Sequence, residues 1–140
     1  MTTRHAWLPP RGTLLISTDL HGNGDDFRAL RDRFLRAARN DPDVHWAVLG
    51  DTVHGPDIES RAEHPDLYDY PDESGAIVLE LLSLRQRYPE QVHYVLGNHD
   101  HAHIGGPRTR KFYDDEAEHL EARLSPPERV ALRALFSTAK

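Results

Sequence analysis

The chain has 140 residues, of which 29% are charged and 38% apolar, with a formal net charge of −6 and no cysteine. This length suits a single domain, and the composition is that of a globular protein rather than of a membrane span. The lack of cysteine excludes disulfides and thiolate metal sites, and the negative charge argues against nucleic-acid binding, which draws on clustered Lys and Arg.

The N-terminal sequence, MTTRHAWLPPRG, lacks the apolar core of a signal peptide, and no apolar run approaches the length of a membrane span. We therefore expect a cytoplasmic protein with no membrane partner. Ten histidines are many for a chain of this length, and histidine is the commonest metal ligand.

The first strand is predicted at residues 13–17 (TLLIS), and it runs into DLHG. Side chains two residues apart on a strand point the same way, so Asp19 and His21 can share one target. A carboxylate with a neutral imidazole suits Mn, Fe or Zn better than Ca or Mg. The alternative is a loop of turn formers, DLHGNG, that only starts the next helix.

The middle of the chain continues this alternation. A helix is predicted over 25–39 from its apolar spacing, and NDPD ends it. The second strand, 44–49 (VHWAVL), is rich in branched and aromatic residues and runs into GDTVHG. Residues 50–73 carry seven acidic side chains after Asp51 and no detectable period, so we expect a long loop there.

A second helix is predicted over 76–88, and a third strand, 92–96 (VHYVL), runs into GNHDH. Two helices close the chain, over 114–124 and 126–137. Ser125 and Glu128 have the spacing of a capping box at the start of the last helix.

Strands that alternate with helices predict an α/β fold, a parallel sheet flanked by helices. Ligands of such sheets bind beyond the carboxyl ends of the strands. All three predicted strands end in potential metal ligands, which we expect to meet at one edge. They are Asp19 and His21, Asp51, and the run Asn98, His99 and Asp100. His45 and His93 lie within strands and are expected to pack between sheet and helices.

The order D-x-H, G-D and G-N-H-D, each after a strand, resembles the calcineurin-like metallophosphoesterases and leans toward their protein-phosphatase-like branch. The resemblance covers residues 13–100. It implies the N-terminal half of the metallophosphoesterase β-sandwich fold, and one domain over 1–140 that lacks its C-terminal half. It also implies two divalent metal ions, with Mn, Fe or Zn favoured.

The resemblance assigns a role to each of these residues. Asp19 and His21 bind the first metal, Asp51 bridges both metals, and Asn98 binds the second. His99 is the acid near the leaving group, and Asp100 orients it.

This chain also departs from the family pattern. His54, Gly55 and Pro56 stand where protein phosphatases have Asp-Arg-Gly, so the phosphate-gripping arginine is absent. Arg28 and Arg61 are candidates to replace it, although both read more simply as surface residues. No histidine follows Leu120 to supply the ligands that the family takes from its second half. His101 and His103 are weak candidates for that role.

The resemblance predicts a metal-dependent phosphoesterase that uses metal-activated water. The alternative is a catalytically incomplete metal-binding fragment or scaffold that needs a complementary half, so the isolated chain is expected to be a poor catalyst. A nucleotide-binding domain is disfavoured because no G-x-G-x-x-G or P-loop sequence is present. The acidic segment 57–73 favours a phosphoprotein or a small phosphate ester over a polyanion. An unfinished sheet predicts self-association or pairing with a second half.

Overall fold

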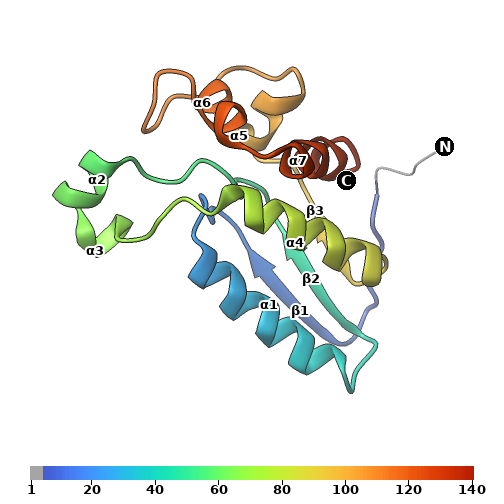
Figure 1. The fold of residues 1–140 in the computed structure, drawn as a ribbon. Helices are drawn as coiled ribbons and strands as arrows, with labels where there is room; N and C mark the ends of the chain where they lie inside the picture. Colours follow the sequence, from blue (N-terminus) through green and yellow to red (C-terminus); the bar gives the residue numbers. More distant parts are fainter. Residues whose placement is uncertain (1–4) are drawn as a thin grey trace.

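Three short parallel strands form the sheet, as the alternating pattern predicted (Figure 1). The computed structural model describes residues 5–140, so residues 1–4 of the predicted domain lie outside it. The strands are β1 (Thr13–Ser17), β2 (Val44–Val48) and β3 (Val92–Tyr94), in the order β1-β2-β3. Leu15 lies opposite Trp46, and Trp46 lies opposite Val92.

The helices between the strands lie on one face of the sheet (Figure 1). α1 (Gly24–Ala38) connects β1 to β2, and α4 (Ser74–Arg87) follows β2 and leads to β3. Both crossovers advance the sheet in the same direction. Because such crossovers are right-handed, their helices fall on the same face. No described helix is long and apolar enough to span a bilayer.

The closing helices are α6 (Glu116–Arg123) and α7 (Pro126–Ser137). The capping box at α7 is confirmed, because Glu128 accepts hydrogen bonds from the Ser125 backbone N–H at 2.7 Å and from its hydroxyl at 2.8 Å. α7 packs against α4, and its Phe136 stacks on Tyr94 of β3 with ring centroids 5.8 Å apart.

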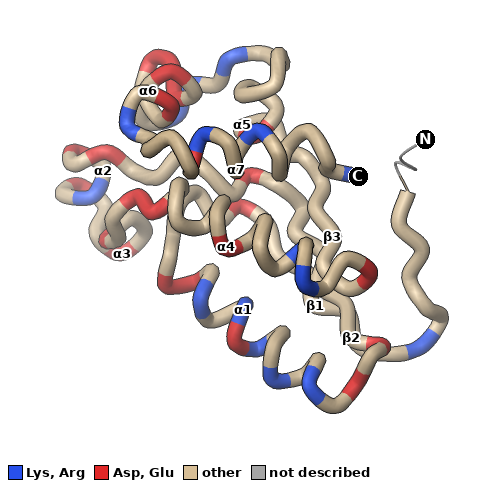
Figure 2. The backbone as a smooth tube through the Cα atoms, turned by 45° about the vertical axis from the view of Figure 1, so that its right-hand side comes forward, with Lys and Arg blue, Asp and Glu red and all other residues tan. Residues whose placement is uncertain are grey.

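The predicted long loop is wrong in part, since it contains two short helices. They are α2 (Ile58–Glu63) and α3 (Pro65–Tyr68). The Asp57 carboxylate caps α2 by accepting the Ser60 backbone N–H at 2.7 Å, and Pro65 occupies the first turn of α3. Two further short helices directly follow the third strand, α5 (Asn98–His101) and η1 (Ala102–Ile104). Acidic residues are spread over the molecule, and α2, α3 and α6 each carry some of them (Figure 2).

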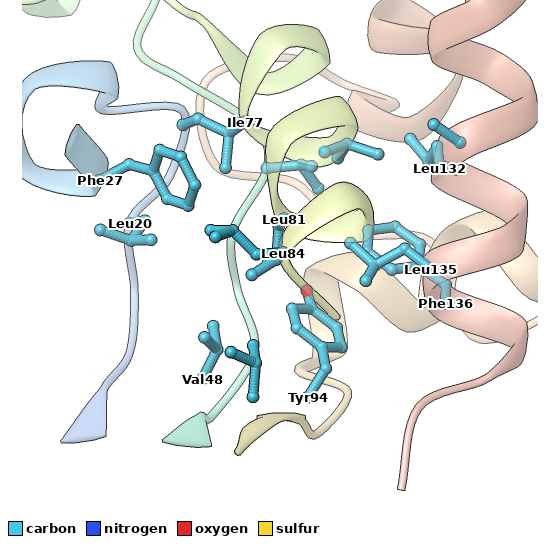
Figure 3. Packing of buried hydrophobic residues seen from close by; sticks show 14 of the residues in the cluster. Leu20, Phe27, Val48, Ile77, Leu81, Leu84, Tyr94, Leu132, Leu135 and Phe136 are labelled. Atoms are coloured by element: carbon cyan, nitrogen blue, oxygen red, sulfur yellow. The ribbon is translucent and has the colours of Figure 1, made fainter. Parts of the chain in front are cut away.

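The hydrophobic core lies between the sheet and the helices (Figure 3). Trp46 and Val48 of β2 are fully buried against Phe27 and Phe34 of α1 and Leu81 of α4. The Trp46 indole N–H donates to the Ser17 hydroxyl at 2.9 Å, so its one polar atom is satisfied inside the core. This core holds the carboxyl ends of the strands in fixed register.

The other face of the sheet exposes apolar side chains. Leu14 and Ile16 are 43% and 56% exposed. The prediction that His45 and His93 pack under the helices is wrong, because Trp46 points toward the helices and its neighbours on a strand must point away. The two imidazoles instead stack on each other on the helix-free face, with ring centroids 5.3 Å apart.

We expect Leu81→Ala to lower the free energy of unfolding by about 2–5 kcal/mol, because a buried leucine loses its contacts and leaves a cavity. The matched control is Leu67→Ala, because Leu67 is exposed on α3. Its effect should lie within about 0.5 kcal/mol. Urea unfolding of both variants measures the difference, and equal losses would contradict the assigned core.

Candidate metal centre

Backbone hydrogen bonds continue the parallel pairing beyond β1 and β2 and bring the first two motifs together. The N–H of Asp19 donates to the Gly50 carbonyl at 3.3 Å, and the N–H of His21 donates to the Asp51 carbonyl at 3.0 Å. Gly22 N–H donates to the next carbonyl at 2.9 Å. The sheet therefore aligns the DLHG and GDTVHG loops residue by residue.

A buried carboxylate joins the third motif to the second. Asp100 accepts the backbone N–H groups of Asp51 at 2.8 Å, Thr52 at 3.2 Å and Gly97 at 2.9 Å. In turn, Asp51 Oδ1 accepts the backbone N–H of His99 at 3.0 Å. These bonds place GDTVHG and GNHD side by side at the edge of the sheet, as the sequence predicted.

The predicted contact between Asp100 and the ring of His99 is not the one that forms. Both oxygens of Asp100 are engaged by backbone N–H groups. The carboxylate beside the ring is that of Glu116, whose Oε2 lies 3.0 Å from His99 Nδ1. Asp100 therefore shapes the loops, and Glu116 takes the place expected for it at His99.

All four described non-glycine residues with positive φ lie in these loops. They are Asp19, His21, Asp51 and His54, with φ angles of 53°, 44°, 52° and 72°. Such conformations cost on the order of 1–3 kcal/mol each and cluster at functional sites. The strain marks these loops as the functional edge of the sheet.

Asp19, His21 and Asp51 form the first candidate metal centre, because each offers one ligand atom and these atoms all lie within 4.8 Å of one another. His21 Nδ1 lies 3.1 Å from the Val53 carbonyl, and His21 Nε2 lies 3.5 Å from Asp19 Oδ1. Burial lowers the pKa of His21, so its ring is neutral. Nδ1–H donates to the carbonyl, which leaves the Nε2 lone pair facing the carboxylate.

The donor chemistry of this centre fits a divalent ion. A hydrogen bond from the Thr18 hydroxyl, 2.7 Å away, lowers the pKa of Asp19, so this carboxylate is ionised. Two carboxylates and a neutral imidazole suit Mn, Fe or Zn. Asn98 is exposed at the start of α5, and among the described contacts none joins its side chain to the centre. Its role as a ligand stays a prediction.

A second cluster was missed by the sequence analysis. His54, His99 and Glu116 are buried, and their ligand atoms also lie within 4.8 Å of one another. The sequence carries no signal for Glu116, because it is one of five acidic residues in the helix predicted over 114–124, and a Gly- and Pro-containing segment separates it from the motifs. Only the folded chain brings it to His99.

Neither arginine considered as a phosphate ligand is free. Arg28 pairs with Asp25 at 2.7 Å and with Glu73 at 3.0 Å, and Arg61 lies 3.8 Å from Asp69. The charge of Lys111, in contrast, acts on two residues of the centre, Asp19 and His21. Burial is the main cause that lowers the pKa of His21, and the Thr18 hydrogen bond is the main cause that lowers the pKa of Asp19. The charge of Lys111 lowers the pKa of both residues further.

The family comparison found one match, to a family described as calcineurin-like phosphoesterase, over residues 12–137. This range includes all three strands, both clusters and the closing helices. Neither the curated proteins nor the solved structures contained a match to this chain.

We expect Asp51→Asn to remove more bound metal than Asn98→Ala, because a bridging carboxylate serves two ions and an amide serves one. Asparagine at position 51 keeps an oxygen that can accept the His99 N–H, so the loops should hold. Elemental analysis after loading with Mn²⁺ and dialysis provides the measurement. Equal losses from the two variants would refute the bridging role of Asp51.

Proposed function

Because this chain belongs to the calcineurin-like phosphoesterase family, we propose that it hydrolyses phosphate esters with divalent metal held by Asp19, His21 and Asp51. The observation that carries the proposal is the orientation of the His21 ring between the Val53 carbonyl and the Asp19 carboxylate. Its Nδ1 lies against the Val53 carbonyl, so Nε2 presents a lone pair beside the Asp19 carboxylate. This is the orientation that a metal-binding histidine needs.

A divalent metal held by these residues would supply positive charge that polarises the ester and acidifies water. Residues of the chain hold the proposed metal ligands in position. Asp51 is held by the backbone N–H of His99 at 3.0 Å, which fixes the carboxylate proposed to bridge two ions. Asn98 adds a neutral oxygen for the second ion without repelling a phosphate dianion. Mn²⁺ suits this oxygen-rich set.

His99 is the proposed proton donor to the leaving oxygen. Its ring lies edge-on to that of His21, with centroids 4.8 Å apart and an interplanar angle of 83°. Nδ1 faces Glu116 and His54 at 3.0 and 2.8 Å, so Nε2 is the nitrogen available to the substrate. The contact with His54 holds the ring, and the Glu116 carboxylate lies beside Nδ1.

Lys111 is the proposed replacement for the missing phosphate-gripping arginine. Its charge acts on Asp19 and His21, whereas Arg28 and Arg61 are committed to carboxylates. A contact between Phe112 and Tyr68, with ring centroids 5.2 Å apart, packs the Lys111 segment against α3.

The acidic side chains on α2 and α3 disfavour a polyanionic substrate (Figure 2). We therefore propose a small phosphate ester or a phosphoprotein as substrate and a cytoplasmic setting. The protein-phosphatase-like branch stays a prediction, since His54 departs from its motif.

The second candidate is a metal-binding scaffold that pairs with another apolar surface. Exposed Leu14 and Ile16 on the helix-free face favour it. A chain that binds Mn²⁺ without hydrolysing any phosphate ester would support this candidate over the enzyme.

For the enzyme, His99→Asn should lower turnover of poorly activated phosphate esters by roughly 10²- to 10⁴-fold, the usual worth of general acid catalysis. Esters with good leaving groups should lose less, because they need no proton. Rates with phenyl phosphate and p-nitrophenyl phosphate in Mn²⁺ test this, and equal losses on both would rule out the proton-donor role.

Lys111→Met should raise KM for p-nitrophenyl phosphate about 10-fold or more, as expected for losing a charged contact to phosphate of about 1.5–3 kcal/mol. The matched control is Arg110→Met, which removes an adjacent exposed cation. Steady-state kinetics of both variants give the comparison. If both variants raise KM equally, general surface charge rather than Lys111 attracts the substrate.

A further inference from the structure

Three buried side chains from separate segments converge beside the proposed active centre. His54 follows β2, His99 lies in α5, and Glu116 begins α6. His54 Nδ1 and His99 Nδ1 lie 2.8 Å apart, and Glu116 Oε2 lies 3.0 Å from His99 Nδ1 and 3.5 Å from His54 Nδ1. The side chains of His54, His99 and Glu116 are 1%, 10% and 0% exposed.

One oxygen of this cluster is unsatisfied. Glu116 Oε1 accepts the backbone N–H of Phe112 at 2.9 Å. Oε2 is buried and has no hydrogen-bond partner among the described residues, although two imidazole nitrogens lie close to it. Burial raises the pKa of Glu116, but the neighbouring His54 and His99 outweigh it and lower the pKa, so the group is a carboxylate. A buried charged oxygen without a partner is costly.

The protons of the surrounding histidines explain why the oxygen lacks a donor. Burial lowers the pKa of His103, so its ring is neutral. Its Nδ1–H donates to Glu121 at 2.7 Å, and its Nε2 accepts Nε2–H of His54 at 2.8 Å. His54 Nδ1 therefore carries a lone pair directed into the cluster. His54 Nδ1 and His99 Nδ1 lie 2.8 Å apart and face each other, and Glu116 Oε2 beside them has no hydrogen-bond donor among the described residues.

We infer that a further divalent cation, Zn²⁺ by its donor set, binds between His54, His99 and Glu116, separate from the ions that Asp51 is proposed to bridge. Zinc bonds of about 2.0–2.2 Å in tetrahedral geometry would hold ligand atoms about 3.3–3.5 Å apart. The three ligand atoms of this cluster lie 2.8, 3.0 and 3.5 Å apart, so the two closer pairs would move apart by a few tenths of an ångström when the cation binds. Two histidines and one glutamate form a known zinc donor set that leaves one position open. His54 is hydrogen-bonded to His103, which is hydrogen-bonded in turn to Glu121. Metal-bound histidines typically make such a bond with the ring nitrogen that does not face the metal.

This inference goes beyond the proposed hydrolase. The cluster is imidazole-rich and buried and selects Zn²⁺, whereas the set of Asp19, His21 and Asp51 is oxygen-rich and open to Mn²⁺. The cation would take Nδ1 of His99 and leave Nε2 for the substrate. It would also fasten α6 to the loops that follow β2 and β3.

Zinc binding is measured in the Asp51→Asn background, which weakens the first centre. Glu116→Gln added to this background should remove one equivalent of Zn²⁺ and weaken its binding more than about 100-fold, since it removes a ligand rather than an outer contact worth about 10- to 100-fold. His103→Asn should weaken binding by about 10- to 100-fold. Glu118→Gln, on an exposed position of the same helix, is the matched control and should keep the parent affinity.

Parent-like zinc affinity in the Glu116→Gln variant would overturn the inference. If this variant fails to fold, the inference is tested instead with His54→Gln, by measuring the visible absorption of bound Co²⁺. Four-coordinate Co²⁺ absorbs strongly, and this band should be lost in His54→Gln but kept in the control His64→Gln. A band that persists in His54→Gln, or a weak six-coordinate band in the parent, would show that the cluster holds no such cation. Hydrolysis with Mn²⁺ is assayed separately, so failure of the proposed function is distinguishable.

Discussion

The carboxylate of Asp100 is the interaction on which the functional edge of the sheet depends. It is fully buried and accepts three backbone N–H groups, from Asp51, Thr52 and Gly97. A buried carboxylate without partners would be costly, so these three bonds favour the arrangement in which the two loops lie side by side. Because of them, Asp51 stays in its left-handed turn, and α5 begins where the N–H of His99 can reach the Asp51 carboxylate.

Close approach of the backbone completes this arrangement. Gly50 has a φ of 83°, and a side chain there would collide with the backbone of Gly97. A side chain at Gly97 would in turn collide with Asp51. The two loops can touch only because both positions lack a Cβ. Strain at Asp51 and His54 is then offset by tertiary hydrogen bonds, as is typical of a site that holds its ligands before anything binds.

The two histidine-containing clusters at this edge differ in their donor atoms and in their exposure to solvent. Around His21 the donors are mostly carboxylate oxygens, with Asp19 open to solvent and the charge of Lys111 nearby. Around His54 the donors are mostly imidazole nitrogens, closed from solvent. His99 stands between them, with its ring against His21 and Nδ1 toward Glu116. The reaction proposed at the open centre and the cation inferred at the closed cluster would use different nitrogen atoms of His99.

The sequence by itself determined the parallel sheet, the helices α1 and α7, and the meeting of Asp19, His21 and Asp51 at one edge. Period-two and helical spacing are local properties, and the carboxyl ends of parallel strands must coincide. Only the tertiary structure decided that Asp100 binds backbone N–H groups and that Glu116 lies at His99. It likewise decided which face of the sheet no helix covers. These outcomes depend on pairing between residues distant in the chain, where packing and the satisfaction of buried charges, rather than local propensity, select the partner.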